Sequence, residues 1–560
     1  MTQGTVADAV VAALEVAGVD VVFTLCGNHI LPLQEAMRRR GMRCVATRSE
    51  ASAVMAADAY GRIRRRAGVA LVTGGPGVAN TAGALLTAMG NQSPVVLLSG
   101  EPSLAAEGRG AQQEADHVGL TAAATKASLR ATRADHVLER LREAFVTAEH
   151  GRTGPVHLTI PVDVQQAALA VGDAVPSPRP DLPAPVVPPA FVRMVAEHVR
   201  GAERVALVVG AGVWQHRGEA AVAALAGDVG LPVFTLDSAR GILPDSAACA
   251  LGSADPGLNG AASQIALADC VIVAGRDADF RMGYGSLLRP SAVVVHVDAE
   301  VRGLGRNLPA GALPAAGDPA AFLGGLAAEL AGHRARAQWA EPAAAPDGGP
   351  DSSDGGGGAM HPATVAAAIA RAGVRAGAIF ALDCGEFVQW CRQIIPAEAP
   401  GRWLRLGPQA TCGAGLPFGI GAQAARPDAP VVVIAGDGGL GYHVADLETA
   451  ARCGLPLVVV VGQDGAWGVE QSLQRGVYGE GAGFTSELTP TNYELIARGF
   501  GVEAVRVSDV TDLEAELSAA LEARRPRLIG VEIRNVPSSG TQRLVRSIRA
   551  EVGERISTTT

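Results

Sequence analysis

Short, mainly apolar runs recur along the chain and alternate with longer alanine-rich segments. Such runs cover residues 19–25, 69–73, 379–383, 431–435 and 457–462, and each leads into a turn that contains glycine. A strand inside a parallel sheet is covered on both faces, so it is apolar at successive positions rather than at alternate ones. The pattern therefore predicts parallel strands alternating with helices, which is an α/β fold.

Two stretches interrupt this alternation. Residues 176–189 are rich in proline, which favours extended chain, and residues 340–358 form a Pro/Ala/Asp/Gly run with too little apolar surface to order itself. A chain of 560 residues is long enough for about three domains. We therefore predict three doubly wound parallel-sheet domains, at residues 1–175, 190–335 and 360–540.

Glycine-containing and polar turns follow several of the predicted strands. Ligands of open parallel sheets bind beyond the carboxyl ends of the strands. The turns at residues 26–30, 74–77, 436–439 and 463–467 all lie at such ends. The residues that carry candidate chemistry are therefore expected at this edge of the N-terminal and C-terminal sheets.

Composition narrows the possible functions. The net charge of −9 leaves no electrostatic footprint for nucleic acid or an anionic membrane. No apolar stretch reaches the roughly 18 residues that cross a bilayer, and the first 20 residues do not resemble a signal peptide. The eight cysteines are scattered without a C-x-x-C pair, which favours free thiols in a cytoplasmic protein.

Arginines cluster at residues 38–40 and, further along, at Arg62 with residues 64–66. Basic side chains are common near the carboxyl ends of helices, where they complement the helix dipole. We interpret both clusters as solvated helix ends rather than as a phosphate or partner site.

The most informative motif lies around Asp437, which follows an apolar strand between Gly436 and Gly438. Glycines let the backbone approach phosphate oxygens, and a carboxylate beside them can hold a hard cation. Residues 444–453 read as a helix whose N-terminus can receive a diphosphate. Asp464 ends the next strand, so it can converge with Asp437 on one Mg²⁺. Two ordinary helix-capping aspartates would be the alternative, but the order of strand, GDG, helix, strand and acid favours the metal.

This layout resembles the thiamine-diphosphate enzymes of the acetolactate synthase, benzaldehyde lyase and 2-hydroxyacyl-CoA lyase group, from residue 6 to residue 536. The resemblance implies a pyrimidine-binding, a central and a diphosphate-binding domain, in that order. It also implies that Asp437, Asp464 and the backbone carbonyl of Ala466 are the metal ligands. The family usually has Asn-Asn where this chain has Gln463-Asp464, so Asp464 adds a negative charge beside the diphosphate.

Glu50 begins an alanine-rich segment in the N-terminal part. As plain structure, an acid in a first helical turn complements the helix dipole, and Ser49 can cap the helix. The resemblance implies more, because a glutamate at this motif bonds the aminopyrimidine of the cofactor and favours its reactive tautomer. The presence of Glu50 argues against the glyoxylate-carboligase branch of the family, which lacks this acid. Since Glu50 and Asp437 lie in different domains, and the resembling enzymes share each cofactor between two subunits, a homodimer or homotetramer is implied.

Three further residues are candidates for setting the reaction. His29 lies in the turn after a strand, where a neutral imidazole can relay a proton to a developing alkoxide, or can simply bond to backbone. Gln113 matches the family glutamine that touches the cofactor-bound intermediate, and its neighbour Gln112 makes the pocket more polar. Glu470 matches a pocket glutamate of pyruvate and indolepyruvate decarboxylases, or is a solvated helix acid.

The resemblance also assigns positions around the cofactor. Cys412 occupies the place of a bulky Met, Leu or Ile that holds the cofactor bent, and Trp467 packs nearby or lines the pocket. The predicted cofactor-binding set is Glu50, Cys412, Gly436, Asp437, Gly438, Gly439, Asp464, Ala466 and Trp467. We do not expect FAD, because residues 210–212 lack the third glycine of the dinucleotide fingerprint and residues 257–260 lack the His-Gly of flavin-binding acetolactate synthases.

The activity implied by the resemblance is decarboxylation of a small 2-oxo acid such as pyruvate, followed by addition to a second carbonyl. A 2-hydroxyacyl or benzoin-type carbon–carbon lyase and a simple 2-oxo acid decarboxylase are the alternatives. A hypothesis of a different kind is that the protein binds the cofactor but is a catalytically silent partner. The intact set of Glu50, Asp437 and Asp464 argues against it. No Ser/His/Asp set, zinc cluster or P-loop is present in the sequence.

Overall fold

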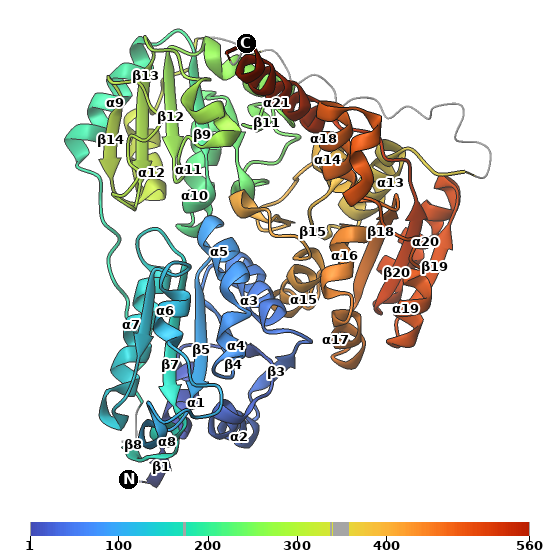
Figure 1. The fold of residues 1–560 in the computed structure, drawn as a ribbon. Coiled ribbons are helices and arrows are strands. Elements are labelled where there is room, and N and C mark those ends of the chain that lie inside the picture. Colours follow the sequence, from blue (N-terminus) through green and yellow to red (C-terminus); the bar gives the residue numbers. More distant parts are fainter. Residues whose placement is uncertain (1, 172–174, 337–338, 340–357, 559–560) are drawn as a thin grey trace.

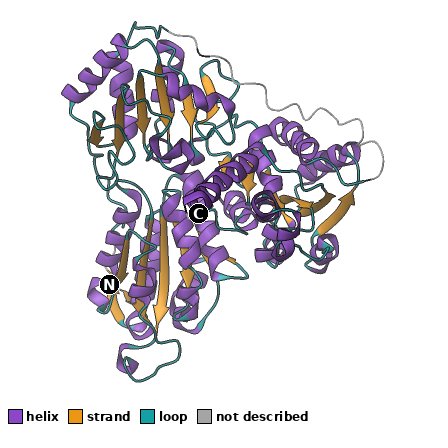
Figure 2. Cartoon of the chain, turned by 45° about the horizontal axis from the view of Figure 1, so that its top comes forward, coloured by secondary structure: helices purple, strands orange, loops and turns teal. Residues whose placement is uncertain are grey.

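Three six-stranded parallel sheets follow one another along the chain, each flanked by helices (Figure 1, Figure 2). The computed structural model describes residues 2–171, 175–336, 339 and 358–558. This architecture confirms the predicted α/β class with three doubly wound sheets. The proposed domain boundaries stay predictions, and most of the predicted linker at 340–358 lies outside the described residues.

The N-terminal sheet has the strand order β3-β2-β4-β5-β7-β6, and a short antiparallel pair, β1 and β8, lies beside it. Its strands are β2 (Val21–Thr24), β3 (Arg43–Ala46), β4 (Gly68–Val72), β5 (Val95–Glu101), β6 (Ala127–Arg130) and β7 (Pro155–Pro161), with β1 (Thr2–Thr5) and β8 (Ala168–Val171) apart from them. Its helices are α1 (Val6–Val16), α2 (Leu31–Arg40), α3 (Glu50–Arg64), α4 (Pro76–Ala79), α5 (Ala82–Gly90), α6 (His117–Ala122), α7 (Val137–Glu149) and α8 (Val162–Gln166).

The central sheet has the order β11-β10-β9-β12-β13-β14, in which the first strand along the chain lies in the middle, as in dinucleotide-binding folds. Its strands are β9 (Val205–Val209), β10 (Val233–Thr235), β11 (Ala250–Ser253), β12 (Cys270–Ala274), β13 (Val293–Asp298) and β14 (Leu313–Ala316). Its α-helices are α9 (Pro189–Gly201), α10 (Ala211–Gln215), α11 (Glu219–Ala224) and α12 (Pro319–Glu329).

The C-terminal sheet has the order β16-β15-β17-β18-β20-β19, which repeats the order of the N-terminal sheet. Its strands are β15 (Ile379–Leu382), β16 (Trp403–Leu404), β17 (Val431–Gly436), β18 (Leu457–Gln463), β19 (Glu503–Val507) and β20 (Arg527–Glu532). Its helices are α13 (Pro362–Arg375), α14 (Glu386–Ile394), α15 (Gly415–Ala425), α16 (Asp437–His443), α17 (Asp446–Arg452), α18 (Gly468–Tyr478), α19 (Tyr493–Gly499), α20 (Val510–Ala523) and α21 (Ser539–Thr558). In both sheets the strand order reverses beside the first strand, between β2 and β4 and between β15 and β17. Such switch points open the crevices in which α/β sheets bind ligands.

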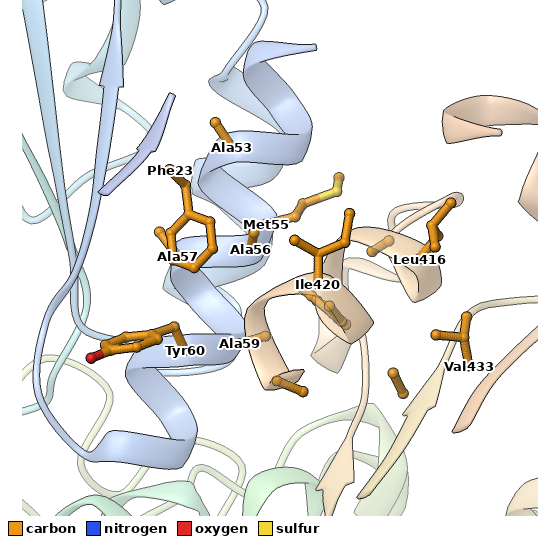
Figure 3. Packing of buried hydrophobic residues seen from close by; sticks show 14 of the residues in the cluster. Phe23, Ala53, Met55, Ala56, Ala57, Ala59, Tyr60, Leu416, Ile420 and Val433 are labelled. Carbon is orange, nitrogen blue, oxygen red and sulfur yellow. The ribbon is translucent and has the colours of Figure 1, made fainter. Parts of the chain in front are cut away.

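The N-terminal and C-terminal domains share one apolar core, which α3 and α15 form where they cross (Figure 3). Small residues on α3, among them Ala53, Ala56 and Ala57, are fully buried in it together with Ile420 of α15. A Cβ atom placed on Gly421 would lie 2.0 Å from the carbonyl oxygen of Ala56. The alanine-rich composition of α3 thus permits two helix backbones to touch.

Replacing Gly421 by alanine should lower the free energy of unfolding by about 2 kcal/mol, because backbone rather than a flexible side chain blocks the new methyl group. Gly324 of α12 is the matched control, since nothing lies within 4 Å of its Cβ position. Gly324→Ala should raise the stability slightly through its better helix propensity. Urea denaturation compares the two variants, and equal midpoints for both would contradict this account of the interface.

The two arginine clusters differ in their surroundings. The first cluster is solvated and makes surface ion pairs, Arg38 with Glu35, Arg39 with Asp8 and Arg40 with Glu15, so its interpretation as a helix end is confirmed. In the second cluster the prediction was wrong for Arg62, which is only 1% exposed.

The side chain of Arg62 points into the interface between the N-terminal and C-terminal domains. It pairs with Asp58 at 2.7 Å, donates to the carbonyl oxygen of Arg405 at 2.7 Å and lies 4.5 Å from the ring centre of Phe418. Spacing of i, i+4 places Arg62 and Asp58 on the face of α3 that packs against the C-terminal domain.

Among the described residues, no helix is both long and apolar enough to span a bilayer.

Candidate active site

The loops that follow β15, β17 and β18 surround a cavity of about 200 Å³ in the C-terminal domain. β17 and β18 are neighbours in the sheet, as the spacing of the two aspartates predicts. Of the predicted residues, the cavity is lined by Cys412, Gly436, Asp437, Gly438, Gly439, Asp464, Ala466, Trp467 and Glu470. It is also lined by residues that the sequence analysis did not single out, among them Cys384, Gly385, Glu386, Gln389 and Arg405.

The carboxyl groups of Asp437 and Asp464 face each other in this cavity. Asp437 accepts one N–H on each oxygen, from Gly438 at 2.9 Å and from Gly465 at 2.9 Å, and Asp464 accepts the N–H of Ala466 at 3.2 Å. Burial, and after it the charge of Asp437, raises the pKa of Asp464 to about 7. The pair therefore concentrates negative charge where a cation would relieve the repulsion.

This donor set fits Mg²⁺ that is shared with a diphosphate. Mg²⁺ is usually held by one or two carboxylates, with phosphate and water oxygens filling the other positions. Among the residues that the structure describes, no group of three or more His, Cys, Asp or Glu side chains could hold a metal ion. Two carboxylates alone thus suit a hard ion that draws its remaining ligands from a main-chain carbonyl and from phosphate oxygens, and do not suit a structural zinc ion.

Glycine is required at the GDG motif by close contact. A Cβ on Gly438 would lie 2.7 Å from the indole ring of Trp467, and one on Gly468 would lie 2.6 Å from a carboxylate oxygen of Asp464. Trp467 therefore packs against the motif and lines the cavity at once. Tyr493 donates from its hydroxyl to the carbonyl oxygen of Asp437 at 2.6 Å and holds the motif from behind.

The helix after the motif begins earlier than predicted. The sequence suggested one helix over residues 444–453, whereas α16 starts at Asp437 itself and a second helix, α17, follows from Asp446. Three of the first five residues of α16 are glycines, and glycine is a poor helix former. The sequence therefore did not indicate a helix at this position. The N-terminus that faces the cavity is therefore that of α16 and not the predicted one.

Asp383, which the sequence analysis treated only as the end of a strand, organises the other wall of the cavity. It is fully buried and accepts N–H groups from Cys384 at 2.7 Å, Gly413 at 2.9 Å and Gly415 at 3.1 Å. These bonds tie the loop after β15 to the segment that carries Cys412. Hydrogen bonding between Cys412 and Cys384, together with burial, raises the pKa of the Cys384 thiol.

In the N-terminal domain, Glu50 is the first residue of α3, and Ser49 caps the helix by accepting the N–H of Ser52 at 3.1 Å. One carboxylate oxygen of Glu50 accepts a hydrogen bond from Asn80 at 3.1 Å. The other lies 3.7 Å from the Cβ position of Gly77, in the turn after β4. The half-buried carboxylate thus lies at the switch point of the N-terminal sheet.

His29 and Gln113 meet at the same place, on either side of Thr73. The Thr73 hydroxyl lies 3.4 Å from Nδ1 of His29 and 3.4 Å from Oε1 of Gln113. Gln113 has the left-handed backbone angle φ of 62°, and Gly75 packs directly against its Cα. Burial lowers the pKa of His29, so its imidazole is neutral at pH 7. The structure brings Glu50, His29 and Gln113 around one turn.

A buried chain of polar groups supports this turn and was not predicted. Nε2 of His117 accepts the N–H of Gly75 at 2.6 Å, and Nδ1 of His117 lies 3.2 Å from Glu101. Glu101 in turn accepts a bond from Arg130 at 2.6 Å. Only the position of His117 directly after the segment that carries Gln113 hinted at a role in the sequence.

The two halves of the site lie apart within one chain. None of Glu50, His29 and Gln113 lines the cavity around Asp437. Ser49 lies 3.3 Å from His443 at the last residue of α16, whereas Asp437 is the first residue of that helix. Seven residues of helix span about 10 Å, so Glu50 approaches the far end of α16.

Comparisons with known proteins cover both halves. Three family models of thiamine pyrophosphate enzymes match the chain: the N-terminal TPP binding domain over residues 4–120, the central domain over residues 192–326 and the C-terminal TPP binding domain over residues 383–531. The first model includes Glu50, His29 and Gln113, and the third includes the residues of the cavity around Asp437.

Full-length relatives agree with these models. The chain is 30% identical to human 2-hydroxyacyl-CoA lyase 2 over 544 residues, which cover 89% of this chain and 84% of the relative. It is 33% identical to an acetolactate synthase of Mycobacterium bovis over 502 residues, covering 86% and 79% of the two chains. It is 28% identical to a probable acetolactate synthase large subunit of Methanocaldococcus jannaschii over 553 residues, covering 94% and 91%.

Proposed function

The chain belongs to the thiamine pyrophosphate enzymes, in the group that includes acetolactate synthases and 2-hydroxyacyl-CoA lyases, and from this premise we propose that it is a carboligase that uses Mg²⁺. It decarboxylates a small 2-oxo acid of the pyruvate type and joins the remaining fragment to a second carbonyl. The observation that carries this proposal is the cavity in which Asp437 and Asp464 face each other beside the Gly436–Gly439 turn. The relatives named acetolactate synthase support the direction of the reaction.

Each residue has a defined task in this proposal. Asp437, Asp464 and the carbonyl oxygen of Ala466 would hold Mg²⁺, and the glycine turn would let main-chain N–H groups reach the diphosphate. Thiamine diphosphate supplies, when bound, a nucleophilic carbon that can carry negative charge next to a carbonyl. Glu50 would hold a proton at a ring nitrogen of the aminopyrimidine, and Cys412 would support the cofactor.

The residues around Thr73 face the substrate. Neutral His29 exchanges a proton with the substrate oxygen as it becomes an alkoxide, and the amide of Gln113 orients the same oxygen. Because Glu50 and Asp437 do not share a cavity within one chain, each site joins the N-terminal domain of one subunit to the C-terminal domain of another, in a homodimer or homotetramer.

The central domain binds no FAD in this proposal. A visible spectrum of the purified protein tests this point.

The proposal is tested by adding pyruvate to the protein with thiamine diphosphate and Mg²⁺ and following CO₂ release and carboligation products together. We expect both to rise at matched rates. A 2-hydroxyacyl-CoA or benzoin-type substrate is supplied in a parallel assay, because His29 beside Gln113 suits the lyase direction equally well. Cleavage of that substrate without any consumption of pyruvate would reject the carboligase in favour of the lyase.

Glu470 distinguishes carboligation from simple decarboxylation. It lies in the first turn of α18, is exposed and also lines the cavity, so it can protonate a fragment that leaves as an aldehyde. In the carboligase proposal Glu470→Gln retains most carboligation and lowers only the small share of aldehyde by-product, because the second carbonyl captures the fragment. Chromatography of the products measures this ratio, and complete loss of turnover would favour the simple decarboxylase.

A further inference from the structure

Six arginines line one pocket of about 470 Å³ on the side of the N-terminal domain that faces away from the predicted cofactor site. The six are Arg64, Arg65, Arg66, Arg179, Arg217 and Arg426. Val19 and Ala67, which precede β2 and β4, also line the pocket, so it lies at the amino ends of strands whose carboxyl ends carry His29 and Thr73. Glu50 and Arg64 are the two ends of α3, which places the pocket about 20 Å from Glu50.

The arginines come from segments that are far apart in the sequence. Arg64 ends α3, and Arg65 and Arg66 follow it directly. Arg179 lies in the segment before the central domain, Arg217 follows α10 of the central domain and Arg426 directly follows α15 of the C-terminal domain. The pocket is therefore a junction of all three domains. The helix dipole favours cations near the carboxyl ends of α3 and α15. It does not explain why arginines from all three domains line the same pocket.

Only three of these six arginines form an ion pair with a described residue. Arg64 lies 3.8 Å from Asp20, Arg65 pairs with Glu219, and Arg179 pairs with Glu149 at 2.8 Å. Within the described part of the chain, Arg66, Arg217 and Arg426 make no ion pair and no side-chain hydrogen bond. Burial, and after it the charges of Arg65 and Arg66, lowers the pKa of Arg217, and the charge of Glu219 opposes this shift only in part.

Two of the six side chains are already held in place. Arg179 stacks 4.8 Å from the ring centre of Phe145, donates to the carbonyl oxygen of Ala67 at 3.1 Å and is 12% exposed. Arg65 lies 4.3 Å from the ring centre of Trp214 and is 17% exposed. A rigid guanidinium group loses little freedom when it binds an anion, so these two arginines form a prepared floor and the exposed ones form a rim.

The size and charge of the pocket identify the class of ligand. A volume of this order is typical of small-molecule sites. Arginine forks match phosphate oxygens in pairs. Three guanidinium groups that form no ion pair with a described residue favour an anion with several charges, which a single carboxylate does not supply. We propose that the pocket binds a small di- or triphosphate, either a nucleotide or an inorganic polyphosphate, and that the bound anion ties the three domains together.

Calorimetric titration of the full chain, saturated with thiamine diphosphate and excess Mg²⁺, tests the proposal with ADP, inorganic tripolyphosphate and orthophosphate as probes. We expect one site per chain for ADP or tripolyphosphate and an affinity for orthophosphate at least about tenfold weaker. Affinity should fall steeply between low and moderate NaCl concentrations. If ADP binds much more tightly than tripolyphosphate, the site also recognises the nucleoside; similar affinities identify phosphate alone as the recognised group.

Variants separate this pocket from unspecific charge. Arg217→Ser with Arg426→Ser should weaken binding by about tenfold or more, because two charge-assisted contacts are lost. Arg142→Ser with Arg193→Ser is the control, since both of these arginines are exposed, lie outside the pocket and make no ion pair or side-chain hydrogen bond with a described residue. Thiamine diphosphate in the filtrate is measured after each titration. Binding that is absent, equal in both double variants or accompanied by cofactor release would overturn the proposal.

Discussion

Replacing Glu50 by glutamine is expected to lower kcat/KM by a factor of about 10³, because a positioned proton-transfer group contributes on this scale. The amide of glutamine keeps the size of the side chain and its contact with Asn80, but it does not hold a proton at a ring nitrogen as a carboxylate does. The cavity around Asp437 is untouched by this change. Affinity for the diphosphate end of the cofactor should therefore fall much less than turnover.

The same glutamate also complements the dipole of α3, so a matched control is needed. Glu139 is an exposed acid in the first turn of α7, away from both halves of the site. Glu139→Gln removes the same helix-dipole interaction, at a cost of about 0.5 kcal/mol in stability, and should leave turnover unchanged. Initial rates and thermal midpoints of both variants are compared. Wild-type turnover in Glu50→Gln would contradict the proposal that the protein is an enzyme and would favour a catalytically silent partner.

Elements whose character is local could be predicted from the sequence. The apolar run at 431–435 corresponds to β17 and the run at 457–462 to β18, because strands buried on both faces are apolar at nearly every position. The cap of α3 by Ser49 was also predictable, since it depends on neighbouring residues. The proximity of Asp437 and Asp464 could also be predicted, because they end consecutive parallel strands and such strands usually lie side by side.

Features that depend on distant segments escaped the sequence analysis. Asp383 receives N–H groups from a segment about 30 residues away, and no local pattern indicates that meeting. Arg62 was interpreted as solvated because basic side chains are common near the ends of helices, whereas it contacts Phe418 and the carbonyl oxygen of Arg405 in the distant C-terminal domain. The separation of Glu50 from Asp437 within one chain was expected only from the family resemblance, because it follows from how α3 packs on α15 and not from either motif.

Asp437→Asn should strongly weaken Mg²⁺-dependent binding of thiamine diphosphate, whereas Asp464→Asn should largely retain it. Both oxygens of Asp437 accept main-chain N–H groups, so an amide would turn its NH₂ towards one of these donors and also lose a ligand charge. Such a loss is worth about 3 kcal/mol, or roughly 100-fold in affinity. Asp464 accepts one main-chain N–H, and an amide there can donate to Asp437 instead.

The pH dependence of Mg²⁺ binding separates these two roles further. Because the pKa of Asp464 is raised to about 7 from its ordinary 3.8, the folded chain without metal retains a proton that the unfolded chain has lost. Stability without Mg²⁺ should therefore fall as the pH rises from about 4 to 7, while Mg²⁺, which replaces this proton, binds more tightly over the same range. Asp464→Asn removes the titrating group and should flatten both trends. Thermal midpoints with and without Mg²⁺ across this range provide the measurement, and a wild-type midpoint that rises with pH in the absence of metal would show that the two carboxyl groups do not share a proton.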